Sequence, residues 1–541
     1  MNYFKNEKGS ALLVVMLMFL VFTILGLAIV SSSLGGSNRT EKRETEVTEN
    51  LNALKSIKEA NALIQAFVEE KENESDNEVK LLKNDNIEHY DSAILAFING
   101  QNDRVNPEDE EFKTGNAFRL SDKTSEYPGI SLSDYTRVIE IETSLYRQRV
   151  FITAMPSFLK YAIGSRGFLT INGSPYIDGN VYSNLGLDIT RNAEYIYKNV
   201  KDDEPTALPA ITENKEVFVE NEGNITLGKI PLHPSEIKKA FDGNPIFNND
   251  ETTYVAVDIH KTFLEKLTEG GFTSENLPSP NMSDGEKQQF IRQFISKSYT
   301  PIDELRSSQI GGSNKLYKVS DYGLLYPGDT KIDADEIELE DDQWLIINGD
   351  ATFESKGKSR MDVKANILVT GDLTIKGNFS FHSVIYVLGK TTLNNVKIVC
   401  YQDTCNNNDE SDDAVLILMT QGFLDIARIN EFTSITEDET EDNNNQISGY
   451  LYTASDAIIY AVGSLLNIDG GIFSGGNLIV NSYRGNADEN DSKTGLIFYA
   501  KEGTRFSRLK IKNDNRLFLN QAQGLPKVNN LEVIPGRLVK N

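Results

Sequence analysis

The chain has 541 residues, and 54 Lys and Arg against 80 Asp and Glu give a formal net charge of −26. That length is too great for one ordinary core and predicts two to four structural units. The acidic excess disfavours nucleic acid as a partner, because binding needs basic groups that neutralise phosphates. Two cysteines and four histidines leave little material for a zinc or iron–sulfur site, so we expect no metal and no cofactor.

A long apolar segment lies close to the N-terminus. Residues 9–38 contain no charged side chain, and residues 11–30 are interrupted only by Thr23 and Gly26. Twenty helical residues span about 30 Å, the thickness of the hydrocarbon core of a bilayer. We therefore predict a transmembrane helix over residues 10–36 with the lipid bilayer as its partner. Its typical members are Ala11, Leu12, Leu13, Val14, Leu20, Leu27 and Val30.

A cleaved secretory signal peptide is the alternative for this segment, because Lys5 and Lys8 form a short basic region before it. The apolar run is longer than that of a typical signal peptide, which favours retention in the membrane. Positive charges are nearly balanced on the two sides, so they do not fix the orientation. The size, acidity and strand-rich pattern of the remainder favour a single-pass protein of the cell membrane with an extracellular C-terminal part.

The pattern after the membrane segment also predicts a helix, over residues 37–75. Apolar residues recur there at spacings of mostly three and four, as on one face of an amphipathic helix. We expect one long or once-kinked helix from about residue 10 to 70, with residues 34–37 as its weakest point because glycine disfavours helix. The apolar positions are Val47, Leu51, Leu54, Ile57, Leu63, Ile64, Phe67 and Val68.

The N-terminus resembles a class III prepilin. The short leader of residues 1–9 ends in Lys8-Gly9, and Ser10 precedes the apolar run and its amphipathic continuation. More narrowly, residues 1–70 resemble the PilX-type minor pilins of type IV pili and the tip pseudopilin of type II secretion, and residues 39–63 carry part of this similarity. The resemblance implies that prepilin peptidase cuts after Gly9 and leaves Ser10 first. It also implies other pilin-like subunits as partners of the helix.

One position departs from the major pilins. They carry Glu five residues into the mature chain, and Val14 stands there instead. PilX-type and tip-type relatives commonly lack this Glu as well, so the departure favours a minor or initiating component. A plain signal-anchor helix with an accidental Gly-Ser pair remains the alternative.

Residues 76–157 form a small mixed α/β segment in this interpretation. Residues 138–142 and 149–152 alternate between apolar and polar side chains, which predicts a short antiparallel pair of strands.

From residue 158 onward, a glycine followed by apolar positions separated by one residue recurs throughout the chain. A glycine turn that feeds a short strand with alternate side chains inward is the unit of a parallel β-solenoid. We predict the first part of a solenoid over residues 158–232 and its main part with a tail over residues 311–541, with an ordinary antiparallel β-sandwich as the alternative. The repeats start at Gly167, Gly179, Gly349, Gly371, Gly389, Gly422, Gly463 and Gly476.

Residues 233–310 predict a helical insertion between the two solenoid parts. Helices are expected over residues 235–241 and 261–267, and Ser283 with Glu286 forms a capping box at the start of another. Residues 406–413 and 437–445 are acidic, Asn-rich and predicted to be solvated loops. The overall fold class is therefore α+β: a long N-terminal transmembrane and amphipathic helix, then a mainly β region with a helical insertion.

The two cysteines suggest a disulfide. Cys400 and Cys405 are close enough in sequence to close a short loop in an exported domain, and we favour this bond over two free thiols. A calcium loop around Asn486, Asp488 and Asn490 fits poorly, because Asp491 occupies the position of the expected glycine. A solvated loop is the preferred interpretation there.

Carboxylates near the starts of the repeats raise the question of a polysaccharide-cleaving enzyme. Asp350, Asp372, Asp425 and Asp469 lie there, and such enzymes carry several carboxylates on one face. Asp is also a common turn residue, and we prefer that explanation. The histidines His89, His233, His260 and His382 are isolated in sequence, and no nucleotide-binding motif is present.

The sequence thus predicts a non-catalytic, membrane-anchored, pilin-like component of a type IV pilus or pseudopilus system. Its β-solenoid would serve as an extracellular platform for partners. Two other classes stay open: a membrane-tethered carbohydrate-active β-helix enzyme, and a cell-envelope surface protein unrelated to pili.

Overall fold

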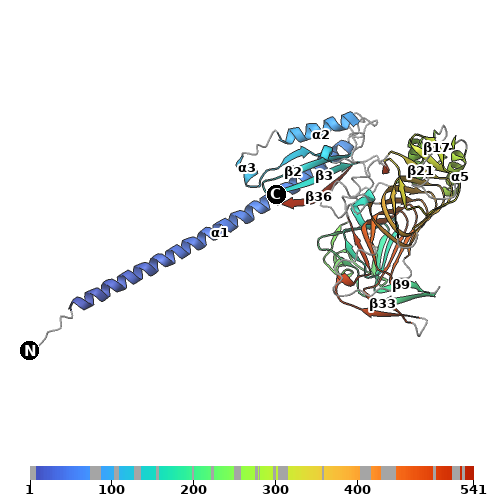
Figure 1. Cartoon of the computed structure of the whole chain (residues 1–541). Coiled ribbons are helices and arrows are strands. Elements are labelled where there is room, and N and C mark those ends of the chain that lie inside the picture. Colours follow the sequence, from blue (N-terminus) through green and yellow to red (C-terminus); the bar gives the residue numbers. More distant parts are fainter. Residues whose placement is uncertain are drawn as a thin grey trace, which may run out of the picture.

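A computed structural model of the whole chain shows a long helix that leads into a small domain and a large β region (Figure 1). The structure describes residues 8–73, 87–102, 109–126, 136–153, 157–197, 200–220, 224–248, 257–273, 278–279, 281–296, 300–301, 315–340, 342–355, 359–401, 416–427, 446–490, 495–513, 524–526 and 531–540.

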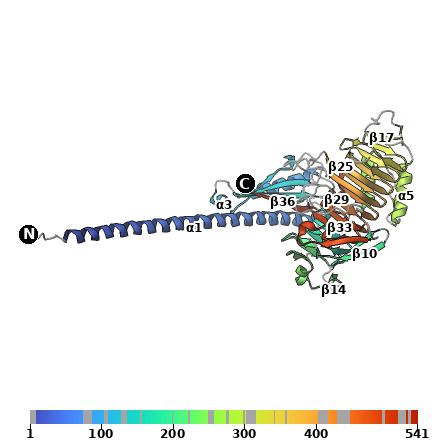
Figure 2. The same ribbon diagram turned by 60° about the horizontal axis from the view of Figure 1, so that its bottom comes forward.

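Helix α1 (Lys8–Asn73) runs without a break through the membrane segment and the amphipathic segment. Its first half projects away from the rest of the molecule, as Figures 1 and 2 show. The prediction of one long helix is confirmed, and the glycines at 35 and 36 do not end it. The helix is therefore one rod that joins two very different environments.

A small domain is built on the second half of α1. Its four-stranded antiparallel sheet has the order β1-β2-β3-β36, and the expected pairing of residues 138–142 with residues 149–152 is confirmed. Strand β36 lies at the edge of this sheet, whereas the sequence assigned these residues only to a tail after the solenoid. The elements are α2 (Ile87–Asn102), α3 (Glu110–Lys113), β1 (Arg119–Asp122), β2 (Thr136–Glu142), β3 (Tyr146–Thr153) and β36 (Glu532–Lys540).

The core of the small domain lies between α1, α2 and the sheet. The buried positions of α1 follow a helical spacing, but they include small residues that the apolar pattern did not single out: Ala53, Ile57, Ala60, Ile64 and Val68. Three members of the predicted apolar stripe, Val47, Leu51 and Leu63, are exposed instead. The sheet thus selects a face rotated from the one that hydrophobicity alone indicates.

The large β region is one 28-stranded sheet in which most pairs are parallel. Its strands stack in three parallel ladders, A, B and C, and successive strands of the chain pass from one ladder to the next. Ladder A contains β4 (Tyr161–Ser165), β7 (Asn180–Ser183), β12 (Glu216–Val219), β15 (Ile246–Asn248), β18 (Gly323–Tyr326), β21 (Trp344–Ile347), β24 (Asn366–Val369) and β27 (Leu416–Thr420).

Ladder B contains β5 (Phe168–Gly173), β8 (Gly186–Thr190), β13 (Ile225–Leu227), β19 (Thr330–Ile332), β22 (Ala351–Glu354), β28 (Leu424–Ala427), β30 (Ala457–Ala461) and β32 (Leu478–Ser482). Ladder C contains β6 (Tyr176–Asp178), β11 (Ala210–Ile211), β20 (Glu336–Glu338), β23 (Arg360–Lys364) and β35 (Leu509–Lys512). Four long strands bend between ladders: β25 (Leu373–Val387), β26 (Thr391–Cys400), β29 (Gln446–Thr453) and β31 (Leu466–Ser474).

The order of the stack differs from the order of the chain. The coil formed by β31, β32 and β35 pairs with the coil formed by β4, β5 and β6, more than 280 residues earlier in the sequence. The two regions that the sequence separated, 158–232 and the part after 311, are therefore one continuous stack. We call β4–β8, β11–β13, β15, β18–β32 and β35 the parallel stack.

Short antiparallel elements decorate the stack. Three strands pair antiparallel at its ends, and two hairpins form separate two-stranded sheets. They are β14 (Ile230–Pro231), β16 (Thr300–Pro301), β17 (Tyr317–Ser320), β9 (Asn192–Tyr197), β10 (Val200–Pro205), β33 (Gly485–Asn490) and β34 (Gly495–Ala500). The 3₁₀ helices among the described residues are η2 (Thr124–Glu126), η3 (Ser157–Lys160), η5 (Pro234–Lys239) and η8 (Thr504–Phe506).

The helical insertion covers the outer face of ladder A. Helices α4 (Ile259–Glu269) and α5 (Asp284–Ile295) include the predicted helix over 261–267 and the capping box of Ser283 with Glu286, which are both confirmed. The residues expected as a helix over 235–241 form the 3₁₀ helix η5 instead. Apolar side chains of both α-helices pack with Trp344, Leu368 and Tyr386 of the ladder. The α+β class with a mainly β C-terminal region is thus confirmed.

Candidate functional site

The exposed half of α1 is the first candidate surface. Residues Val14–Ser31 have a mean hydropathy of 2.8, and none of this window is buried inside the molecule. Leu20 and Leu27 are 60% and 64% exposed, and Val14 and Val30 are exposed as well. Exposure of so large an apolar surface to water is unfavourable. A lipid bilayer or the apolar surface of another protein would therefore be expected to cover it. By length and composition the helix can cross a membrane, and a signal sequence passes the same test.

The proposed processing position lies at the very start of α1. Gly9 and Ser10 are helical, as are Ala11, Leu12 and Leu13, whereas the leader residues 1–7 lie outside the described residues. Cleavage after Gly9 therefore stays a prediction.

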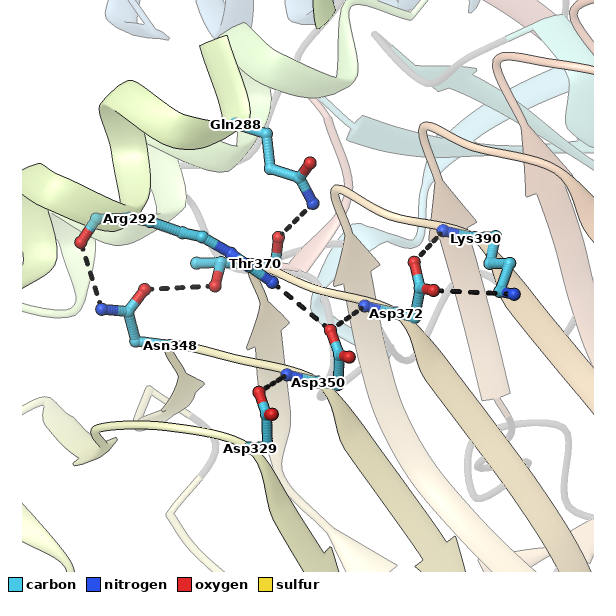
Figure 3. A network of polar contacts seen from close by, with 8 residues as sticks. All are labelled: Gln288, Arg292, Asp329, Asn348, Asp350, Thr370, Asp372 and Lys390. Carbon is cyan, nitrogen blue, oxygen red and sulfur yellow. Dashed lines mark hydrogen bonds and ion pairs between the residues drawn. The ribbon is translucent and has the colours of Figure 1, made fainter. Parts of the chain in front are cut away.

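The second candidate is a row of carboxylates along the corner between ladders A and B. Asp329 Oδ1 accepts a hydrogen bond of 2.9 Å from the backbone N–H of Asp350, and Asp350 Oδ1 accepts one of 2.9 Å from Asp372. Asp372 Oδ1 accepts one of 3.0 Å from Lys390 in the next coil (Figure 3). Each carboxylate therefore binds the backbone of its neighbour in the stack, which is a turn role.

Further along the stack, the same arrangement returns. Asp456 Oδ1 accepts a hydrogen bond of 2.7 Å from the backbone N–H of Asn477. Asn477 Oδ1 accepts one of 2.9 Å from the backbone N–H of Phe168. The last bond joins chain segments 309 residues apart. The two distant parts of the sequence are thus joined by a hydrogen bond from a backbone N–H to a side-chain oxygen. The same kind of bond joins successive coils.

The glycines of the repeat make room for these carboxylates. A Cβ at Gly371 would overlap Asp350 Oδ1, and one at Gly389 would overlap Asp372 Oδ1. The glycines also bond to each other, since Gly371 N–H donates to Gly349 O and Gly389 N–H donates to Gly371 O, both at 2.9 Å. The Gly-Asp pair of the sequence is therefore one structural unit of the corner.

The four aspartates considered for catalysis lie in different parts of the stack. Asp350 and Asp372 lie on the corner, Asp425 lies in ladder B beside Thr392, and Asp469 lies in ladder C, where it accepts 3.1 Å from Gln446 Nε2. Partial burial raises the pKa of Asp425, and nearby Lys390 opposes that rise. Only Asp350 and Asp372 of these four aspartates are therefore neighbours in the stack.

Helix α5 is attached to the same corner, a contact that the sequence did not reveal. Gln288 Nε2 donates 2.6 Å to Thr370 O, and Asn348 Nδ2 donates 3.1 Å to Arg292 O (Figure 3). The Arg292 guanidinium lies 3.3 Å from Asp350 Oδ1. Asp350 thus serves the corner and the helix at once.

The remaining candidates lie apart. Cys400 ends β26 and is disulfide-bonded, and its predicted partner Cys405 lies outside the described residues, as do the loops 406–413 and 437–445. Asn486, Asp488 and Asn490 lie in strand β33, so the predicted solvated loop is wrong at these positions. Within the described parts of the chain, His, Cys, Asp and Glu form no group of three that could hold a metal ion.

The histidines are also separated. His260 is buried on α4, with its Nδ1 3.8 Å from Asp284 Oδ1. His233 bonds to Ser235 at the start of η5, and His382 lies near Tyr401. The side chain of His89 lies outside the described residues.

The chain has similarities among solved structures. No protein-family model and no curated protein matches the chain. Among solved structures, the chain is similar to the competence-associated pilin ComZ from Thermus thermophilus, with 12% sequence identity and a TM-score of 0.26. The alignment covers 75% of this chain and 80% of that protein. The proposal below rests on the residues of this chain.

Proposed function

We propose that the chain is a single-pass protein of the cell membrane that holds a β-solenoid outside the cell, as a pilin-like structural or assembly component of a type IV pilus or pseudopilus system. The observation that carries the proposal is the division of α1. Its first half is apolar and exposed, whereas its second half packs into a small α+β domain. Other pilin-like subunits would cover the exposed half after it leaves the bilayer.

The β region supports the solenoid part of the proposal. Strands inside the three ladders have a parallel neighbour on each side. Successive strands of the chain lie in different ladders. Parallel coils of this kind satisfy their backbone groups in the stacking direction and resist bending. Such a head would be a rigid platform for partners.

The absence of Glu at Val14 supports a specific place in an assembly. In the major pilins that this N-terminus resembles, that Glu forms a bond with the free N-terminal amine of a neighbouring subunit. A subunit with Val there would lack this bond, which suits a first or capping subunit. Prepilin peptidase would be a processing partner at Gly9.

The proposal gives the head no catalytic role. The corner carboxylates Asp350 and Asp372 each accept a backbone hydrogen bond from the next coil at Oδ1, so both have a structural role. This use supports the turn interpretation over a role in glycoside hydrolysis, which employs a pair of carboxyl groups on the two sides of one glycosidic bond.

Membrane retention tests the anchor. In Leu20→Arg/Leu27→Arg, each charge should cost about 3 kcal/mol at the centre of the helix. We expect the variant to lose most of its alkali-resistant membrane association in fractionated cells. Leu51→Arg is the matched control, because Leu51 is equally exposed but lies beyond the apolar window. A double variant that stays embedded, or a wild-type chain that is freely soluble with its leader intact, would contradict the anchor.

Mass spectrometry of the mature N-terminus tests the pilin-like part. We expect a chain that begins at Ser10 when prepilin peptidase is present and an intact leader when it is absent. Gly9→Leu should keep the leader in both strains. An intact leader on a membrane-embedded wild-type protein, in a strain with active peptidase, would favour an envelope protein unrelated to pili.

A further inference from the structure

Strand β36, near the C-terminal end of the described residues, completes the sheet of the small domain. Strand β36 pairs antiparallel with β3 from Thr153 opposite Glu532 to Tyr146 opposite Lys540. The whole parallel stack lies between these two strands in the sequence. The sheet beside the anchor helix is therefore completed by residues that are synthesised after the whole parallel stack.

Strand β36 forms part of the surface on which α1 rests. Leu531 and Val533 are buried with Ile57 and Ile64 in the core of the small domain. A chain of polar contacts follows the same path, since Asn61 Nδ2 donates 2.8 Å to Gln148 Oε1. Gln148 Nε2 in turn donates 2.7 Å to the carbonyl of Gly536. Without β36, α1 and β3 would lose apolar cover and a hydrogen-bond acceptor.

The parallel stack brings β36 to β3. The first coil after β3 pairs with the last coil before β36, as in Ile163 opposite Ile472 and Ile171 opposite Val480. Asn513 Nδ2 donates 3.3 Å to Leu159 O, so the chain leaves the stack beside the point where it started.

The returning segment is attached on its way. Leu525 is buried against the outer face of ladder A. The hydroxyl of the fully buried Tyr386 donates 2.7 Å to Gly524 O. The segment that leads from the last coil to β36 therefore gains these contacts only when ladder A has formed.

We propose that β36 is a completion latch: the membrane-proximal domain reaches its final fold only after the parallel stack has closed on itself. Before closure, a flexible chain of several hundred residues separates β3 from β36, and its ends rarely meet. Closure turns their encounter into a local one and raises the effective concentration of β36 at β3. The face of α1 from Ala53 to Val68 then becomes fully covered only in a molecule with a finished head. This inference does not depend on assembly into a filament.

Hydrogen exchange on the full-length protein in detergent micelles tests the latch. In a chain that ends at residue 530, we expect amides in residues 53–68 and 146–153 to exchange at least tenfold faster, with residues 366–400 unchanged. A synthetic peptide of residues 531–541, added in excess, should restore slow exchange. Unchanged protection of residues 53–68 in the truncated chain would overturn the proposal.

A variant of the stack junction tests the dependence on the head. Ile472→Asp/Val480→Asp places two carboxylates in the buried junction, far from β36 in the sequence. We expect faster exchange at the junction and also in residues 53–68, with the second effect reversed by the same peptide. Ile458→Asp, on a half-buried outward position of β30, should leave both regions protected. Fast exchange at the junction with slow exchange in residues 53–68 would overturn the coupling.

Discussion

At the scale of single residues, the Gly-Asp pair explains most of the corner between ladders A and B. The carboxylate of Asp350 occupies the space that a side chain at Gly371 would fill, and it accepts the next backbone N–H. The sequence therefore repeats glycine for steric room and aspartate for hydrogen bonding. Hydrogen bonds to charged groups contribute about 1.5–3 kcal/mol each, so a row of them matters to stability.

Gly371→Ala should destabilise the stack by about 2 kcal/mol, because the new methyl group would meet Asp350 Oδ1, Arg292 Nη2 and Gly349 O. Gly285→Ala is the control, since a Cβ at this position in α5 meets nothing within 4 Å. It should be neutral or stabilise by about 0.5 kcal/mol, because glycine disfavours helix. Denaturant unfolding followed by tyrosine and tryptophan fluorescence measures both, and equal effects would contradict the corner interpretation.

At the scale of elements, helices α4 and α5 seal the apolar outer face of ladder A. Their own sequences specify them well: Asp258 caps α4, Ser283 and Glu286 cap α5, and both have one apolar face. Their position on the stack is a tertiary property, because any apolar face of the stack could receive an amphipathic helix. The polar contacts of Gln288 and Arg292 with the corner fix that position.

His260 makes this helical cover sensitive to pH. Burial lowers the pKa of its imidazole, and the nearby Asp284 opposes the shift only partly. Its Nε2 is buried without a hydrogen-bond partner among the described residues. The unfolded chain, with a histidine pKa of about 6.5, binds a proton first as the pH falls. Stability should therefore be constant above about pH 7 and decrease below about pH 6.5.

The thermal unfolding temperature measured between pH 8 and 5 checks this expectation. His260→Gln should flatten the decrease between pH 6.5 and 5, whereas His233→Gln, at an exposed position, should keep it. Identical pH profiles for wild type and His260→Gln would contradict the role of His260.

At the scale of the whole molecule, the junction between distant parts of the chain decides the architecture. Arg484 is buried at this junction, and its guanidinium lies 2.7 Å from Asp242 Oδ2. Its Nη2 also donates 2.9 Å to Leu208 O. One side chain from the last coil therefore ties two segments that precede helices α4 and α5.

Asp242→Asn should destabilise the head by about 1–2 kcal/mol, because it leaves the buried Arg484 charge without its carboxylate partner. The loss is smaller than for a fully buried pair, since Asp242 is half exposed and water can replace part of the interaction. Glu236→Gln is the control: it removes an exposed pair with Lys239 and should have no measurable effect on denaturant unfolding. A loss of equal size in both variants would show that the junction has no special role.

The sequence by itself determined the local features of this protein. An uninterrupted apolar run, a helical spacing after it, glycine-led strands and a capping box are signals contained within a few residues of each other, and they predicted α1, the mainly β region and α5. It could not give the order of the stack, the face of α1 that is buried or the place of β36. A strand with alternating apolar residues can pair with any of several similar strands, because backbone hydrogen bonds do not depend on the identity of the side chains. The stacking of the coil β31–β32–β35 on the coil β4–β5–β6 is a tertiary property, and it brings β36 to the sheet that packs on α1.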